Sequence, residues 1–409
     1  MFSLRERYID RVTRPLIAIV VAAGLAAASV APRAQATQEA DPARFARIAA
    51  VVETAMARRD LPGAVVLVGE GDSIVYRRAF GQRAVLPSTE PMTEDTIFDA
   101  ASLTKVVATT TSVMQLIEQG YIRLRDPVKK FVPGFDTRAK GVITIQQLLT
   151  HTSGLAPDLP LEVEFKGTDE AIRRASATVL AAPPGTRLIY SDINFFVLGH
   201  IVAQVSGEPL DRYVKSRIFD PLQMPDTGFV PAASLKPRIA PTERCGPFAW
   251  PCSTPGDAFL RGTVHDPTAR RMGNVAGHAG LFTTAADLSR FCRMLLNGGA
   301  LDGASILSPA AVERMIAPST PAGMKDVRGL GWDIDSGDSG NRGDLFSVGT
   351  SFGHTGWTGT SLWVDPKTRA YVIFLSSRVH PNGRGDVVAL RGQVANIAAA
   401  VLSNLRANR

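Results

Sequence analysis

The chain contains short strings of residues whose types and spacing could support acyl transfer. In Ser102-Leu-Thr-Lys105, a spacing of three puts the hydroxyl and the ammonium on the same face of a helix. A neighbouring Lys and the positive end of a helix both lower the cost of forming an alkoxide, so the pair could activate a serine nucleophile. The competing interpretation is a Ser that only caps the helix, because such a string also arises by chance.

Two later strings could supply the remaining groups. Tyr190-Ser-Asp-Ile-Asn194 opens an apolar helix, and a Tyr shielded from water beside a Lys can act as a general base. The alternative there is a packing Tyr followed by an Asp helix cap. Gly353-His-Thr-Gly356 precedes a predicted strand, where a Gly-flanked backbone can offer N–H groups to an acyl oxyanion.

The elements that must position these strings differ between the ends and the middle of the chain. Each end combines a helix with a hairpin, whereas residues 106–330 are mostly helical patches broken by Pro/Gly loops. The predicted elements are helices over 42–59, 102–120 and 390–405, and strands over 64–68, 74–76, 360–364 and 370–375. Because strands do not alternate regularly with helices, a parallel doubly wound sheet is disfavoured. We predict an α/β fold in which 37–105 and 330–409 form one antiparallel sheet subdomain, interrupted by a mostly helical subdomain over 106–329.

Residues 1–36 have the pattern of a secretory signal peptide. An Arg-rich segment is followed by an apolar stretch over 15–30 and by the small-residue signal Ala34-Gln35-Ala36. The alternative is an uncleaved anchor, but this stretch is short for the roughly 20 residues of a membrane span. Cleavage after Ala36 would leave a mature domain over 37–409 that is periplasmic or secreted, without a stable membrane span.

Composition excludes several classes of protein. The 409 residues are 45% hydrophobic, which is enough for a core and excludes disordered and collagen-like chains. The net charge of +7 comes largely from scattered Arg residues without the runs or aromatic interleaving of a nucleic-acid surface, so we expect no nucleic-acid partner. In an exported chain Cys245 and Cys252 could close a small loop, while Cys292 is expected as a buried free thiol. No Cys has metal-ligand spacing, so we expect no metal and no cofactor.

Other candidate residues have less support. Gly349-Thr-Ser-Phe-Gly353 fits the string of a hydrolase nucleophile elbow, but an elbow needs a following helix, and a strand is predicted here. Gly337-Asp-Ser-Gly340 reads as a polar loop between strands. Among the histidines, His151 and His278 could line a cleft or be structural, and His200 is expected in the core.

Taken together, Ser102-Leu-Thr-Lys105, Tyr190-Ser-Asp192 and His354-Thr-Gly356 resemble, in order and separation, the motifs of the beta-lactamase-related serine hydrolases. That family includes class C beta-lactamases, penicillin-binding D,D-peptidases and family VIII carboxylesterases. Family-like segments also fill the gaps, so the resemblance covers about residues 42–405; they are Leu148–Leu155, Pro221–Thr227, Gly277–Thr284 and Gly356–Pro366. The resemblance implies the family's split α/β fold with a helical insertion.

The resemblance also implies roles. Ser102 would be the acylated nucleophile, Lys105 the partner that tunes it, and Tyr190 the general base that later protonates the leaving group. His354 matches the third motif, where beta-lactamases usually carry Lys and some D,D-peptidases carry His. The backbone N–H groups of Ser102 and Trp357 would form the oxyanion hole. Thr355 and Gly356 would complete this edge of the substrate site.

One position departs from the family pattern. Asp192 stands where beta-lactamases and D,D-peptidases usually carry Asn, whose amide can donate to a substrate amide carbonyl, whereas an ionised Asp only accepts. Efficient antibiotic hydrolysis is therefore disfavoured. Asn194, one helical turn after Tyr190, is expected to face the cleft. The expected substrate is a small-molecule ester or a peptidoglycan-like peptide. The alternatives are a catalytically weak penicillin- or muropeptide-binding protein and a true class C-like beta-lactamase. The sequence leaves the oligomeric state open.

Overall fold

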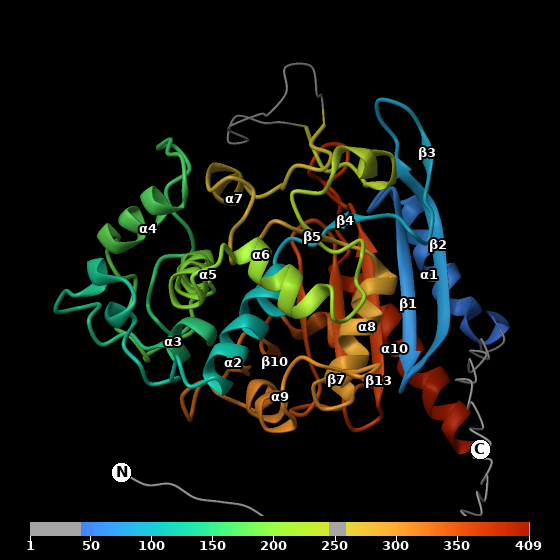
Figure 1. The fold of residues 1–409 in the computed structure, drawn as a ribbon. Helices are drawn as coiled ribbons and strands as arrows, with labels where there is room; N and C mark the ends of the chain where they lie inside the picture. Colours follow the sequence, from blue (N-terminus) through green and yellow to red (C-terminus); the bar gives the residue numbers. More distant parts are fainter. Residues whose placement is uncertain (1–41, 245–258, 409) are drawn as a thin grey trace, which may run out of the picture. The chain divides into compact units, whose positions relative to one another are not determined.

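The computed structural model describes residues 42–244 and 259–408 (Figure 1). The predicted signal peptide and the predicted Cys245–Cys252 bridge lie outside these residues. Within the two described stretches, no helix combines the length and apolarity needed to cross a membrane.

An eight-stranded antiparallel sheet draws its strands from both ends of the chain, which confirms the predicted α/β fold (Figure 1). Its strand order is β3-β2-β1-β13-β12-β11-β10-β9. The bounds are β1 Gly63–Glu70, β2 Ser73–Ala84, β3 Glu90–Pro91, β9 Val327–Arg328, β10 Asp333–Asp335, β11 Phe352–Thr355, β12 Ser361–Asp365 and β13 Ala370–Ser376. The two predicted hairpins are β1–β2 and β12–β13, and β1 also pairs with β13, so the chain ends meet at the centre of the sheet.

Helices cover both faces of this sheet. Successive side chains of a strand point to opposite faces, so Val66 joins one hydrophobic core and its neighbour Val65 joins the other. The first core includes residues of α1 (Ala46–Ala57) and α10 (Val388–Ala407), which correspond to the predicted terminal helices. On the second face, α8 (Ala285–Leu296) packs against β1 and β13. This helix comes from the middle of the chain, so part of the predicted helical region is itself a layer on the sheet.

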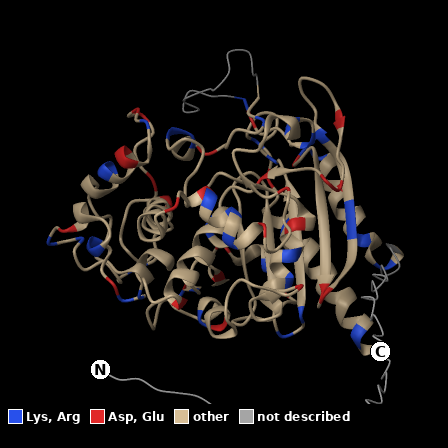
Figure 2. Cartoon of the chain, in the orientation of Figure 1, with Lys and Arg blue, Asp and Glu red and all other residues tan. Residues whose placement is uncertain are grey.

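The rest of the middle region is helical with two small sheets. Its helices are α2 Thr111–Glu118, α3 Ile145–Leu149, α4 Thr168–Ala177, α5 Asp192–Ser206, α6 Leu210–Val214, α7 Pro267–Arg271 and α9 Pro309–Ile316. The small sheets have the order β4-β6-β5 (Phe98–Asp99, Leu281–Thr283, Gly228–Phe229) and β7-β8 (Ala300–Leu301, Ala304–Ser305). Helix α5 is the centre of this region. It is buried along most of its length and packs against α2, α3, α4 and α6. Basic and acidic side chains are interspersed over the elements (Figure 2).

Candidate active site

Ser102 lies at the start of the predicted helix, in a backbone that is held in place from outside the helix. The residue before it, Ala101, has a left-handed φ of 48°, and its N–H donates to Oδ1 of Asp99 (2.9 Å). After Ser102 the helix passes through a wider π-helical stretch, Lys105–Thr110, before α2. Nζ of Lys105 donates to Oγ of Ser102 at 2.9 Å, so the two side chains meet as their spacing predicts.

Lys105 is fully buried and makes two further polar contacts. Its Nζ lies 2.6 Å from Oδ1 of Asp192 and donates to the carbonyl of His278 at 3.1 Å. Burial alone would lower the pKa of Lys105, but the negative charge of Asp192 and the nearby Tyr190 outweigh burial and raise it above its ordinary value. Lys105 is therefore an ammonium at neutral pH, which suits it to stabilise a negative oxygen and not to accept a proton.

Tyr190 immediately precedes α5 and is enclosed by rings and cations. Its ring stacks on His151 with centroids 4.3 Å apart, and Nζ of Lys105 lies 5.0 Å from its centroid. The ring of His151 is held by the N–H of Ser191, which donates to Nδ1 at 3.0 Å. Burial, followed by the charges of Arg328 and Lys105, lowers the pKa of His151 well below its ordinary value. A neutral imidazole thus forms the back wall behind the Tyr190 ring.

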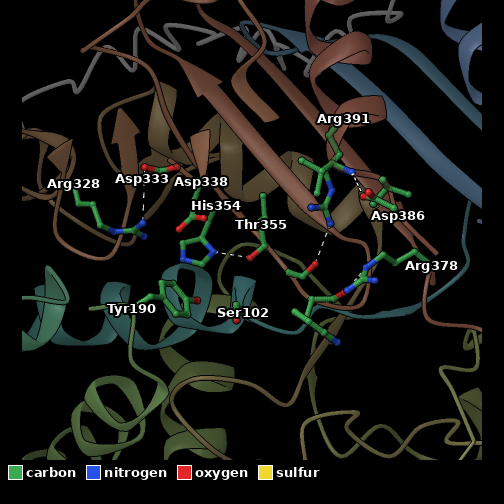
Figure 3. A pocket seen from close by; sticks show the side chains of 14 residues that line it. Ser102, Tyr190, Arg328, Asp333, Asp338, His354, Thr355, Arg378, Asp386 and Arg391 are labelled. Atoms are coloured by element: carbon green, nitrogen blue, oxygen red, sulfur yellow. Dashed lines mark hydrogen bonds and ion pairs between the residues drawn. The ribbon is translucent and has the colours of Figure 1, made fainter. Parts of the chain in front are cut away.

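The third motif lies on β11, with His354 directed toward the same cavity (Figure 3). Nδ1 of His354 is 2.7 Å from the carbonyl of Thr355, so this nitrogen carries the proton. Burial, with the charges of Arg328 and Lys105, lowers the pKa of His354 well below its ordinary value. Its Nε2 is buried and has no hydrogen-bond partner among the described residues. His354 therefore brings a neutral acceptor to the position where a Lys would bring a charge.

The segment after β11 is fastened to the backbone that precedes Ser102. Oγ1 of Thr358 donates to the carbonyl of Asp99 (2.8 Å), and Oγ1 of Thr360 donates to that of Ala100 (2.9 Å). At Gly356 a Cβ would lie 2.6 Å from the carbonyl oxygen of Ala100, so only glycine fits there. These contacts fix the backbone of Trp357 relative to Ser102, as a two-donor oxyanion hole requires.

A cavity of about 490 Å³ opens over these groups (Figure 3). Ser102, Tyr190 and His354 line it together with the predicted Thr355, Gly356 and Trp357. Six charged side chains complete its wall: Arg328, Asp333, Asp338, Arg378, Asp386 and Arg391.

Asn194 does not face this cavity, so that expectation is wrong. Its side chain is fully buried, its Oδ1 accepts from Oγ of Ser153 (2.6 Å), and its Nδ2 lies 3.2 Å from Nδ1 of His151. Asn194 thus braces the His151 ring behind Tyr190. Asp192 is also absent from the cavity wall, because its Oδ1 is turned toward Lys105.

A group of acidic residues extends behind Lys105. Ligand atoms of Asp192, Asp266 and His278 lie within 4.8 Å of one another, so the set could hold a metal ion. Each carboxylate already has a partner in the chain, because Asp192 pairs with Lys105 and Oδ1 of Asp266 lies 2.9 Å from Nε2 of His278. Against the effect of burial, the charge of Asp266 raises the pKa of His278. Burial and the nearby charges of Asp266 and Asp192 raise the pKa of Asp158 to about 7. We therefore interpret the group as a buried charge network.

The other sequence candidates lie elsewhere. Ser351, in the string resembling a nucleophile elbow, is buried and followed by strand β11, and its hydroxyl donates to the carbonyl of Ser347. His200 is only half-buried, so its predicted place in the core is wrong, and Cys292 is a buried free thiol, as predicted.

Sequence reasoning missed three residues that contact the site. Asp99 orients Ala101, Arg328 lies 5.8 Å from the Tyr190 ring centroid, and Nη2 of Arg391 donates to the carbonyl of Gly356 (3.0 Å). Arg328 and Arg391 act across the fold, so nothing local marks them, and Asp99 is held by a distant partner as well, the N–H of His265.

Comparison with known proteins agrees with this geometry. A sequence profile of the family described as Beta-lactamase matches residues 48–397. The chain belongs to the beta-lactamase family. A protein of Escherichia coli (strain K12), provisionally named a D-alanyl-D-alanine carboxypeptidase, is 34% identical over 355 residues, 78% of this chain and 79% of that protein.

Two solved structures show the same fold. One is EstCE1, described as a hydrolase with promiscuous acyltransferase activity, with a TM-score of 0.69, 24% identity and coverage of 87% of this chain and 99% of that chain. The other is a penicillin-binding protein homologue from Caulobacter crescentus, with a TM-score of 0.69, 21% identity and coverage of 88% and 98%. The chain is thus a member of a family of hydrolases that share a beta-lactamase/transpeptidase-like fold.

Proposed function

We propose that this chain is an exported serine hydrolase that cleaves esters or D-amino-acid-type amides through an acyl-enzyme on Ser102. The observation that carries the proposal is the 2.9 Å contact between Nζ of Lys105 and Oγ of Ser102 at the edge of the cavity that Tyr190 also lines. An adjacent base or a neighbouring cation that lowers the cost of the alkoxide can activate a serine, and Lys105 is such a cation.

The proposed reaction has two steps. Oγ of Ser102 attacks the carbonyl carbon while its proton passes to the phenolate form of Tyr190 acting as general base, and the N–H groups of Ser102 and Trp357 stabilise the oxyanion. Tyr190 then returns the proton to the leaving group as the acyl-enzyme forms, and a water molecule activated in the same way releases the acid. Because Lys105 is held as an ammonium by Asp192, its role is to stabilise the Ser102 oxygen.

The substrate class is supported from two directions. The Escherichia coli relative, by its name, favours a peptide ending in D-alanine. Esters are favoured by the site itself, because Asp192 and the neutral His354 offer a substrate amide carbonyl no side-chain donor in place of the usual Asn and Lys. An ester needs no such donor, so we rank short esters first and D-alanyl peptides second.

The decisive experiment combines covalent labelling with a substrate panel. Mass spectrometry after reaction with a phosphonate probe is expected to place the label on Ser102, and Ser102→Ala is expected to abolish turnover. The panel comprises p-nitrophenyl acetate and butyrate, nitrocefin and a D-Ala-D-Ala peptide. A label on another Ser, or turnover retained by Ser102→Ala, would overturn the mechanism. No burst and no steady rate on any substrate would instead indicate a binding protein.

Export rests on residues 1–36. Fractionation of cells that express the full chain, followed by N-terminal sequencing, is expected to find a periplasmic or secreted protein beginning at Thr37. A chain that keeps residue 1 and sediments with membranes would indicate an anchored protein.

A further inference from the structure

The geometry points to Arg328 as the residue that supplies the positive charge for Tyr190, in place of the charge that His354 lacks. This inference rests on the proposed function, because it concerns the base of the same reaction.

Among the described residues, four titratable or charged side chains face Tyr190: Lys105, His151, Arg328 and His354. The two imidazoles are neutral in this environment, so neither can stabilise a phenolate by charge. Lys105 interacts with Tyr190, but its charge is shared with the carboxylate of Asp192 at 2.6 Å. Within 42–244 and 259–408, Arg328 is the second cation that faces this ring, and no carboxylate lies as close to it as Asp192 lies to Lys105.

Arg328 is buried without a close countercharge. Only 1% of its side chain is exposed, and it comes from the short strand β9. Its nearest described carboxylate, Asp333, lies 3.8 Å away, and that carboxylate accepts hydrogen bonds from Ser336 (2.7 Å) and Ser339 (2.9 Å). Asp338 also lines the cavity but makes no ion pair with Arg328.

A buried guanidinium with so little compensation is costly unless a further negative group pairs with it. Its Nη2 donates to the carbonyl of Gly331 (3.2 Å), and its Nε has no hydrogen-bond partner among the described residues. Its guanidinium carbon lies 5.8 Å from the Tyr190 ring centroid, and Figure 3 shows both side chains at the same end of the cavity. A phenolate formed on Tyr190 would be the missing countercharge.

The test is the pH–rate profile of Arg328→Met with p-nitrophenyl acetate, a substrate with no carboxylate that Arg328 could bind. We expect kcat at pH 7 to fall about 10–100-fold, part of the roughly 10²–10⁴-fold effect of a positioned base, with KM little changed. The acid limb of the profile, where the rate rises with pH, is expected to move to higher pH in Arg328→Met. At pH values above the shifted limb the rate of the variant should recover. Arg328→Lys keeps the charge and is expected to restore most of the rate and the position of the limb.

A second variant tests the same idea with the opposite sign. Asp333→Asn removes the partial countercharge while keeping the side-chain shape, so the acid limb is expected to move to lower pH. Arg342→Met is the matched control, because Arg342 contacts Asp335 on the neighbouring strand at 2.8 Å and does not line the cavity. Its profile should match that of the wild type.

The inference is overturned if Arg328→Met folds and keeps the wild-type acid limb, or if its loss appears only with substrates that carry a carboxylate. It is also overturned if Asp333→Asn leaves the acid limb in place or moves it to higher pH. This second result is decisive even if Arg328→Met fails to fold. Ser102→Ala is assayed in parallel to separate the two hypotheses. If Ser102→Ala keeps its turnover, the proposed function itself is refuted. If Ser102→Ala is inactive but Arg328→Met keeps the acid limb of the wild type, only the role of Arg328 is refuted.

Discussion

Replacing Asp192 with Asn tests how the catalytic cation is held. The variant removes the carboxylate 2.6 Å from Nζ of Lys105 and restores the residue usual in related enzymes. Opposite unit charges at that distance attract by about 6 kcal/mol at an effective dielectric constant of 20. Removing one member of a buried pair costs about 3–5 kcal/mol, and because 24% of the Asp192 side chain is exposed, we expect the lower end, about 3 kcal/mol.

The first assay is denaturant unfolding of Asp192→Asn between pH 6 and 9. Because the pKa of Lys105 is raised in the folded state, its contribution is fully present below the unfolded value near 10.4 and is lost only as the pH rises through the folded value. The part of the deficit that comes from Lys105 should therefore be constant over this range, whereas the loss of the Asp192 charge also lowers the pKa of Asp158, so the total deficit should shrink toward pH 9. Asp211→Asn is the matched control, because Asp211 also lies in the first turn of a helix, α6, but makes no ion pair with the described residues.

The second assay compares nitrocefin with p-nitrophenyl acetate. The new amide can donate one hydrogen bond to a substrate amide carbonyl, worth about 1 kcal/mol, so the ratio of kcat/KM for nitrocefin to that for the ester should rise about 5–10-fold. A variant as stable as the wild type, with an unchanged ratio, would refute the reasoning that Asp192 both holds Lys105 and disfavours amides.

Three further predictions concern other parts of the site and fold. Because the folded pKa of Asp158 is raised to about 7, the protein should gain stability as the pH falls from 8 to 6. In denaturant titrations at pH 8, Asp158→Asn should raise the free energy of unfolding by about 1–3 kcal/mol. Trp357, 67% exposed on the cavity rim, is expected to contact bulky acyl groups, so Trp357→Ala should keep the rate on p-nitrophenyl acetate within about 3-fold while raising KM for longer esters. Burial raises the pKa of the Cys292 thiol, so a thiol reagent should not modify Cys292 until the chain unfolds. When the protein is denatured without a reductant, the reagent should find one reactive thiol if Cys245 and Cys252 form a disulfide and three if they do not.

The sequence indicated the centre of the sheet well, for a physical reason. Strands β1 and β13 are buried on both faces, so they read as short apolar runs bounded by turn residues, and such runs need no information from distant residues. The spacing of Ser102 and Lys105 likewise predicted their contact, because helical geometry alone brings them together.

The supporting residues could not be found in this way. Asp99 accepts from the N–H of His265, 166 positions away, and Arg328 and His151 approach Tyr190 from segments far apart in the chain. No local period records such contacts. Asn194 shows the converse error, because its placement assumed helical spacing from Tyr190, whereas α5 begins only at Asp192, after the extended Ser191, and none of its residues lines the cavity.

The departures from the family pattern are coupled through charge. Asp in place of Asn at 192 and neutral His in place of Lys at 354 each remove one positive unit from the surroundings of Ser102 and Tyr190. The contact between Lys105 and Ser102 is made with both changes present, so the framework for acyl transfer is kept while its attraction for anionic substrates weakens. Arg328 restores one positive unit, but it is 1% exposed and directed at the Tyr190 ring, so that charge serves the base more than the recognition of a substrate carboxylate. A cleft with this balance should therefore prefer a neutral ester over a substrate with a carboxylate next to the scissile bond, and its rate on the neutral ester should depend little on ionic strength.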